Sequence, residues 1–212
     1  MYWNSQNLES LNNRYRATFI NSLAGIKQAV LVGTKSTSGV ANLAIFNSLI
    51  HIGANPALYG LIIRPDTVER HSLRNILDTG HYTLNYVHAD YWLKAHQTSA
   101  KYPADVSEIQ AVGFSEAYLF NHFAPFVEEA HVKIGLELKE RIDVASNGTI
   151  LLIGSIQHIS CNALLLSDDG FVHLEKATTL ACAGLDAYYK TELLGRLSYA
   201  QPDNPSKIID QP

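Results

Sequence analysis

The 212-residue chain is poor in the residues that cross-link a fold or attract polyanions. Its two cysteines, Cys161 and Cys182, are too few for a disulfide framework, and we expect both to be free thiols in a reducing compartment. Charged residues make up only 17% of the chain, the formal net charge is −4, and no run of Lys and Arg occurs. A nucleic-acid partner would require a basic face, so we expect none.

Long apolar runs are also missing. Residues 1–16 lack the basic start and apolar centre of a signal peptide. The apolar runs at 29–33 and 58–63 are far shorter than the roughly 20 residues that cross a bilayer as a helix. We therefore expect a soluble cytoplasmic protein with no membrane partner.

Several catalytic and binding motifs are absent. No GxGxxG segment occurs, and Gly33–Ser36 lacks the Gly-x4-Gly frame of a P-loop. The segment 113–117 falls short of the GxSxG turn that carries a nucleophilic serine. The nine histidines include no HxxxH or HExxH pair, so we expect no metal site.

What the chain does have is a supply of core residues and short strands. It is 47% hydrophobic, and nothing resembles a linker, so residues 1–212 form one expected domain with an N-terminal cap (1–26) and a C-terminal tail (about 184–212). Strands are expected at 28–34, 81–87, 131–144 and 149–161, the last two joined by a type I′ turn at Asn147-Gly148. Helices are expected at 68–79, ending at Gly80, at 91–99, capped by Asp90, and at 106–112. This pattern predicts a mainly β barrel with inserted helices.

The stretch 39–65 is central to the interpretation. It reads as two strands joined by a turn at 53–56. Side chains alternate along a strand, which places Asn42, Ala44, Phe46 and Ser48 on one face and Leu43, Ile45 and Leu49 on the other. The first face suits a flat ligand with polar edges, although an edge strand facing solvent would have the same pattern.

Cationic and hydroxyl side chains follow this stretch. Arg64 ends the second strand, and Arg70, His71 and Ser72 open the next helix. Donors at a helix N-terminus favour an anion such as a phosphate. The alternative is that Arg70 is an ordinary solvated helix residue.

These features, in this order, resemble the flavin reductase-like family of FMN-binding split barrels, with the flavoredoxin-like branch closest. The matching features are the GVxNxAxFNS strand, the Asn-Pro turn, the strand ending in Arg-Pro and the segment ERHSLRNI at 69–76. The resemblance runs from Lys27 to about residue 200 and implies a Greek-key split β-barrel. Asn47 departs from it, because relatives often have a small hydroxyl residue there.

The resemblance also implies which residues surround FMN. The segment 96–103 is similar to one that approaches the cofactor, although it could equally be an ordinary helix C-terminus. The implied cofactor-binding residues are Asn42, Leu43, Ala44, Ile45, Phe46, Asn47, Ser48, Arg64, Arg70, His71, Ser72, His96, Thr98, Ser99 and Lys101.

The activity implied is hydride transfer from NAD(P)H to flavin, which requires no catalytic side chain of the protein. The alternatives are a flavoredoxin-like electron carrier without nicotinamide activity and a split barrel that has lost its cofactor. The resemblance further implies a homodimer, in which Phe120, Phe123 and Phe126 are candidates for the contact. His173 and the pair Tyr188–Tyr189 either shape the face that receives the electron donor or anchor the tail.

Overall fold

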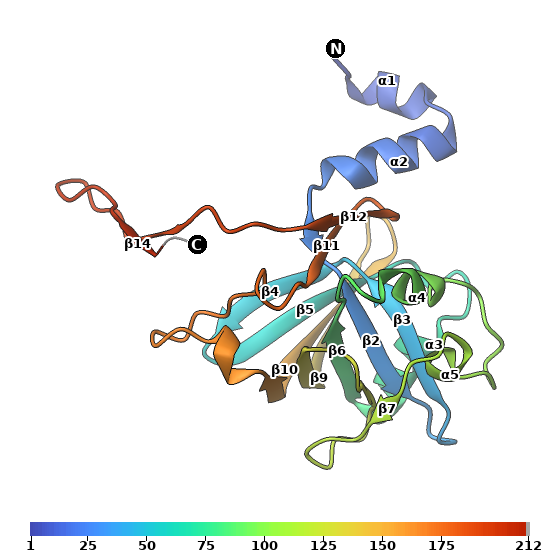
Figure 1. Cartoon of the computed structure of the whole chain (residues 1–212). Coiled ribbons are helices and arrows are strands. Elements are labelled where there is room, and N and C mark those ends of the chain that lie inside the picture. Colours follow the sequence, from blue (N-terminus) through green and yellow to red (C-terminus); the bar gives the residue numbers. More distant parts are fainter. Residues whose placement is uncertain (211–212) are drawn as a thin grey trace.

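The computed structural model describes residues 1–210, and its centre is a seven-stranded antiparallel sheet (Figure 1). Across the sheet the strands are β3 (Ala41–Phe46), β2 (Val30–Lys35), β6 (His81–Tyr86), β9 (Val132–Val144), β10 (Thr149–Cys161), β5 (Ala57–Ile63) and β4 (Leu49–Ala54). The edge strands β3 and β4 are consecutive in the chain, separated only by Asn47 and Ser48. The sheet must therefore curl until its edges approach each other, which is the predicted split barrel.

The barrel interior is filled by alternating apolar side chains, with Leu61, Leu84, Leu136 and Leu152 almost inaccessible to solvent. A second apolar cluster lies on the outer side of β2 and β3 and includes Leu31 and Leu43. The buried residues Ile109 and Phe114, from the segment between β6 and β9, also belong to that cluster. The barrel wall beside β3 is therefore packed on both sides.

The stretch 39–65 contains three strands, where the alternation pattern predicted two. The first predicted strand breaks at Asn47–Ser48 into β3 and β4. Ser48 donates from Oγ to the carbonyl oxygen of Ile62 at 2.7 Å, and the amide of Ile62 donates to the carbonyl oxygen of Ser48 at 3.3 Å. These bonds hold the break against β5, so Ser48 does not continue the face of Asn42 and Ala44.

The β9–β10 hairpin forms as predicted, but its turn is not type I′. Four residues, 145–148, connect the paired Val144 and Thr149, and of these only Gly148 has a positive φ angle, 72°. The Asn147 carboxamide oxygen instead accepts from the amide of Thr149 at 3.0 Å. A type I′ turn needs positive φ at both central residues, so that prediction was wrong.

The helices are shorter than predicted at their starts. The helix α3 (His71–Thr79) ends at Gly80, whose φ is 75°, as predicted. The helix α4 (Trp92–Gln97) begins after Tyr91 and has no side-chain cap, so Asp90 is not its N-cap, and α5 spans only Glu108–Ala111. Before the barrel, where one short helix or an irregular cap was expected, lie α1 (Ser5–Ser10) and α2 (Asn13–Leu23).

Three small sheets and one 3-10 helix complete the fold. The strands β1 (Lys27–Gln28), β11 (Leu180–Ala183) and β12 (Ala187–Lys190) form one sheet, β7 (Glu116–Ala117) pairs with β8 (Phe126–Val127), β13 (Arg196–Leu197) pairs with β14 (Ile208–Asp210), and the 3-10 helix covers Ala163–Leu165. Phe126 is fully buried in its own subunit and is unavailable for the predicted dimer contact, whereas Phe120 and Phe123 are exposed.

Cys161 and Cys182 are free thiols, as predicted. Among residues 1–210, no helix is both long enough and apolar enough to cross a membrane.

Candidate functional site

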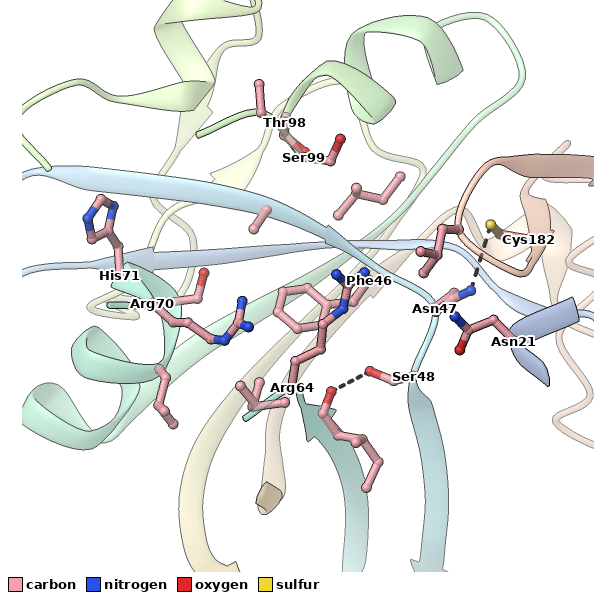
Figure 2. A pocket seen from close by; sticks show the side chains of 18 of the residues that line it. Asn21, Phe46, Asn47, Ser48, Arg64, Arg70, His71, Thr98, Ser99 and Cys182 are labelled. Atoms are coloured by element: carbon pink, nitrogen blue, oxygen red, sulfur yellow. Dashed lines mark hydrogen bonds between the residues drawn. The ribbon is translucent and has the colours of Figure 1, made fainter. Parts of the chain in front are cut away.

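A pocket of about 650 Å³ lies at the split between the barrel edges (Figure 2). One wall is β3 with the Asn47–Ser48 break, and the end of β5 and the start of α3 form another. Residues 98–102, after α4, and residues of the β11–β12 turn close the remaining sides. The volume falls in the range of about 300–1,000 Å³ found for small-molecule sites.

The β3 wall offers backbone donors to a ligand because β3 is an edge strand. The amide of Leu43 donates to Glu108 Oε2 at 3.1 Å and so points away from β2. Hydrogen-bonding direction alternates along an antiparallel strand, so the Ile45 amide also points away from β2. Ile45 lines the pocket, which makes its amide a donor available to a bound ring.

Asn42 connects this wall to α3. Its side chain is buried, and Nδ2 donates to Ser72 Oγ at 2.9 Å and to Thr34 Oγ1 at 3.3 Å. The amide therefore fixes the distance between β3 and the helix start. Asn42 lines the pocket while also serving as a structural bridge.

Asn47 holds the opposite end of the same wall. Its Nδ2 donates to the carbonyl oxygen of Gly184 at 2.6 Å and lies 3.8 Å from Cys182 Sγ, as Figure 2 shows for the sulfur contact. A small hydroxyl side chain could not span from the strand end to this turn. The departure of Asn47 from the family pattern thus has a structural role, tying β3 to the β11–β12 turn.

The start of α3 gathers cationic side chains and backbone donors that suit an anion. Arg70 is the N-cap residue and gives no side-chain hydrogen bond to the helix, so the first-turn amides have no cap partner. Arg70 Nε donates to the Pro65 carbonyl oxygen at 3.0 Å, which positions the guanidinium at the pocket. Arg64, His71 and Lys101 line the same cavity. The helix dipole and the cations together favour a phosphate there.

Two carboxylates also border this cavity, Glu69 and Glu108. Burial raises the pKa of Glu108, while the hydrogen bond from the Leu43 amide and the nearby His71 oppose that rise. Glu69 pairs with Arg74 on the exposed side of α3. The excess of cationic side chains over carboxylates keeps this end of the pocket suited to an anion.

The structure brings 13 of the 15 predicted cofactor residues to this single pocket. The exceptions are Leu43, whose side chain is in the outer apolar cluster, and His96, whose Nδ1 lies 2.8 Å from the Tyr188 hydroxyl. Tyr188 itself lines the pocket, so His96 stands behind a lining residue. Figure 2 shows Arg64, Arg70, Thr98 and Ser99 bordering the same cavity.

The other aromatic and histidine candidates lie apart. His173 does not line this pocket; its Nε2 is 2.9 Å from Ser167 Oγ and its Nδ1 is 2.7 Å from Glu175 Oε1. Tyr189 borders a smaller neighbouring cavity of about 270 Å³, which shares Tyr188 with the first. Of these candidates only Tyr188 can touch a ligand in the larger pocket.

Sequence reasoning missed several lining residues. Asn21, Ala24 and Gly25 belong to the predicted cap, Lys27 directly follows it, and Glu108 lies in the helix expected at 106–112, which was not assigned to the site. The one local signal was Glu108 itself, a carboxylate in an otherwise weakly charged stretch. Glu108 is buried and accepts from the amide of Leu43, which lies 65 residues earlier in the sequence, so no local pattern could reveal its place in the site.

Nowhere in the part of the chain that the structure describes do three or more His, Cys, Asp or Glu side chains gather in an arrangement that could hold a metal ion.

Comparison with known proteins gives one family match and several similar structures. Residues 24–175 match the model of a family described as flavin reductase like domain. A split barrel protein from Shewanella frigidimarina NCIMB 400, provisionally named a flavin reductase, is 44% identical with a TM-score of 0.91, over 94% of this chain and 100% of that one.

Two more distant structures share the fold. Nitrilotriacetate monooxygenase component B from Bacillus cereus is 19% identical with a TM-score of 0.81, over 91% of this chain and 96% of that one. The flavoredoxin of Desulfovibrio vulgaris (Miyazaki F) is 21% identical with a TM-score of 0.70, over 81% and 90%.

Proposed function

The chain belongs to the flavin reductase-like family, and from this premise we propose that its split-barrel pocket binds FMN and that the protein is an NAD(P)H-dependent flavin reductase. The observation that carries the proposal is the pocket itself. One cavity of about 650 Å³ joins an edge strand with a free backbone donor to a cationic helix start.

The chemistry of the lining residues fits FMN. The phosphate would lie at the start of α3, where Arg70 and the uncapped amides offer charge-assisted hydrogen bonds. The ring would lie along β3, with the Ile45 amide at its polar edge and Phe46 against its apolar part. Ser99 and Lys101 line the same cavity and offer a hydroxyl and an ammonium group to the bound FMN.

When bound, FMN supplies the acceptor for a hydride, so the chain needs no acid or base at the donor carbon. The residues of the protein bind, orient and exclude water. Asn42 and Asn47 fix the two ends of the β3 wall through bonds to Ser72 and Gly184. Tyr188, held by His96, is the aromatic surface against which a nicotinamide or another planar donor would stack.

A second candidate is a flavoredoxin-like FMN electron carrier without nicotinamide activity. The similarity in fold to a flavoredoxin supports this second candidate. The two candidates share the flavin pocket and differ in whether a pyridine nucleotide reduces the flavin. We also propose a homodimer.

The test is an absorption titration of the purified protein with FMN, followed by anaerobic NADH and, separately, NADPH. Bound flavin that bleaches within the mixing time supports the reductase and identifies the donor. Bound flavin that stays oxidised with both nucleotides and bleaches with dithionite supports the electron carrier. Failure to bind FMN would defeat both candidates.

A further inference from the structure

A second group of side chains with catalytic chemistry lies outside the pocket proposed for FMN, in the segment that joins β10 to β11. His173 Nε2 lies 2.9 Å from Ser167 Oγ, and His173 Nδ1 lies 2.7 Å from Glu175 Oε1. None of the three residues lines either of the two cavities described above. The chain therefore has a hydroxyl, an imidazole and a carboxylate in series that the proposed flavin chemistry does not use.

The carboxylate determines where the imidazole proton lies. An ionised carboxylate only accepts hydrogen bonds, so Glu175 holds the proton of His173 on Nδ1. In the neutral ring Nε2 is then the acceptor, and the hydroxyl of Ser167 donates to it. A serine that donates to a histidine oriented by a carboxylate is the arrangement that activates a hydroxyl for attack on an acyl carbon.

The backbone holds the histidine in place and leaves the serine near the surface. The side chain of His173 is 7% exposed and that of Glu175 is 20% exposed, whereas Ser167 is half-buried. The amide of His173 donates to the carbonyl oxygen of Leu165 at 2.8 Å, and the amide of Ser167 donates to that of Phe171 at 2.9 Å. The Phe171 ring meets the His173 ring edge-on, with centroids 5.1 Å apart. A general base is thus fixed in position beside a hydroxyl that solvent can reach.

A backbone donor lies beside this hydroxyl. Ser167 begins a turn that the amide of Gly170 closes by donating to the carbonyl oxygen of Ser167 at 2.9 Å. A serine oxygen at the first position of such a turn faces the amide two residues on, here that of Asp169. Within residues 1–210 this amide donates to no other residue, and the Asp169 carboxylate beside it is bound by Arg196 and by the Phe171 amide. The amide can therefore donate to an oxyanion formed next to Ser167 Oγ.

The surroundings of Ser167 indicate which substrate would fit. The carboxylate of Asp169 pairs with Arg196, but that of Asp168 is exposed next to the serine and would repel an anion. The Phe171 ring offers an apolar surface, one face of which lies 4.2 Å from the Arg196 guanidinium. A small ester without negative charge is the substrate class that these groups favour.

We propose that Ser167, His173 and Glu175 form a second active site, which hydrolyses small uncharged esters. Ser167 Oγ bonds to the acyl carbon while His173 Nε2 takes its proton, and the Asp169 amide donates to the resulting oxyanion. The carbon–oxygen bond to the alcohol then breaks, and the alcohol leaves with the proton from His173. A water molecule attacks the acyl-serine, its proton passes through His173 to Ser167 Oγ, and the acid leaves.

The first test is labelling of the full-length wild type with diisopropyl fluorophosphate, an uncharged reagent from which an activated serine displaces fluoride. Mass spectrometry of the digested protein should find one label per chain, on Ser167. The second test is hydrolysis of 4-nitrophenyl acetate, whose kcat/KM should fall at least about a hundredfold in Ser167→Ala, the lower end of what a general base contributes. The control is Ser198→Ala, because Ser198 is an exposed serine that only accepts from the Lys207 amide, and its variant should keep the wild-type rate.

Glu175 is a positioning residue, since it acts through His173. Glu175→Gln should lower kcat at least about tenfold and leave KM within about twofold, a division that general loosening of the loop would not produce. Circular dichroism checks that each variant is folded, and labelling of the wild type needs no variant.

A label on other residues or on none would overturn the proposal, and so would equal hydrolysis by the wild type and Ser167→Ala. Both measurements can be made with and without FMN. Failure of the protein to bind FMN would therefore leave this second site untouched, and failure of the esterase tests would leave the flavin proposal untouched.

Discussion

At the scale of single residues, Arg70 and Ser72 test the phosphate site. Arg70→Ala/Ser72→Ala should weaken FMN binding by at least about tenfold more than riboflavin binding, because charge-assisted bonds to a phosphate are lost. Ser72 also accepts from Asn42, and that loss affects both ligands alike, so the ratio of the two affinities reports the phosphate. Fluorescence titration with each ligand measures it.

The matched control is Arg74→Ala on the same helix. Arg74 pairs with Glu69 and does not line the pocket, so both affinities should stay close to those of the wild type. Equal weakening of FMN and riboflavin in the double variant would show that these residues do not hold the phosphate.

Asn42 tests the β3 wall. Asn42→Leu keeps the side-chain size but removes the bonds to Ser72 and Thr34, and we expect flavin retention to fall by about tenfold while the chain stays folded. The control is Asn75→Leu, a buried amide that also donates to Thr34 but does not line the pocket. Flavin content is measured after gel filtration, and circular dichroism checks the folding of each variant. Unchanged flavin content in Asn42→Leu would contradict the role of Asn42 in the pocket wall.

His122 predicts a pH dependence of stability. Burial is the main cause that lowers the pKa of His122 to about 4; the adjoining His81 and His158 also lower it, while the Tyr82 carbonyl favours the charged form. The same histidine takes up its proton near pH 6.5 in the unfolded chain but only near pH 4 in the folded one. The free energy of unfolding should therefore have its full value above about pH 6.5 and fall by about 3 kcal/mol as the pH drops from about 6.5 to 4.

Urea unfolding at several pH values checks this. His122→Gln cannot titrate and should show a shallower decline than the wild type over that interval. His51→Gln, at an exposed position, should follow the wild type. A wild-type curve parallel to that of His122→Gln would mean that His122 does not contribute.

At the scale of elements, Gly154 lets the barrel close around Tyr82. Tyr82 lies on β6 and is fully buried, and a Cβ on Gly154 of β10 would overlap its hydroxyl and lie 2.9 Å from Cζ. Gly154→Ala should therefore lower the free energy of unfolding by about 1–3 kcal/mol. Pairing it with Tyr82→Phe, which removes the overlapping oxygen, should recover part of the loss, and the absence of recovery in urea unfolding would contradict this packing.

The elements also show what sequence alone could provide. The strand β10 has the predicted bounds, and α3 ends at the predicted Gly80, because turn residues and alternation are local signals. The break at Asn47–Ser48 was not predicted, because it depends on pairing of β4 with β5 after the sheet curls. Most of the pocket was predicted from one strand and one helix start, whereas Glu108 and the end of α2 reach it only through tertiary contacts.

At the scale of the whole molecule, the proposed dimer and the proposed flavin site should be thermodynamically linked. The end of α2 lines the pocket, and Tyr15, Ile20 and Leu23 of the same helix have exposed apolar side chains that a second copy would cover in the proposed homodimer. A ligand that prefers the fixed wall must then strengthen the dimer, and the dimer must strengthen ligand binding by the same factor.

We expect saturating FMN to lower the dimer dissociation constant by about fivefold or more, the lower end of typical coupling. Sedimentation equilibrium over a dilution series, with and without FMN, measures the constant, and FMN affinity in the dilute and concentrated protein gives the reciprocal effect. The variant Ile20→Asp/Leu23→Asp places charges at two of the exposed apolar positions of α2. At every protein concentration it should bind FMN as weakly as the dilute wild type does. Dimer constants that are equal with and without FMN would separate the two proposals, because each site would then form without the other.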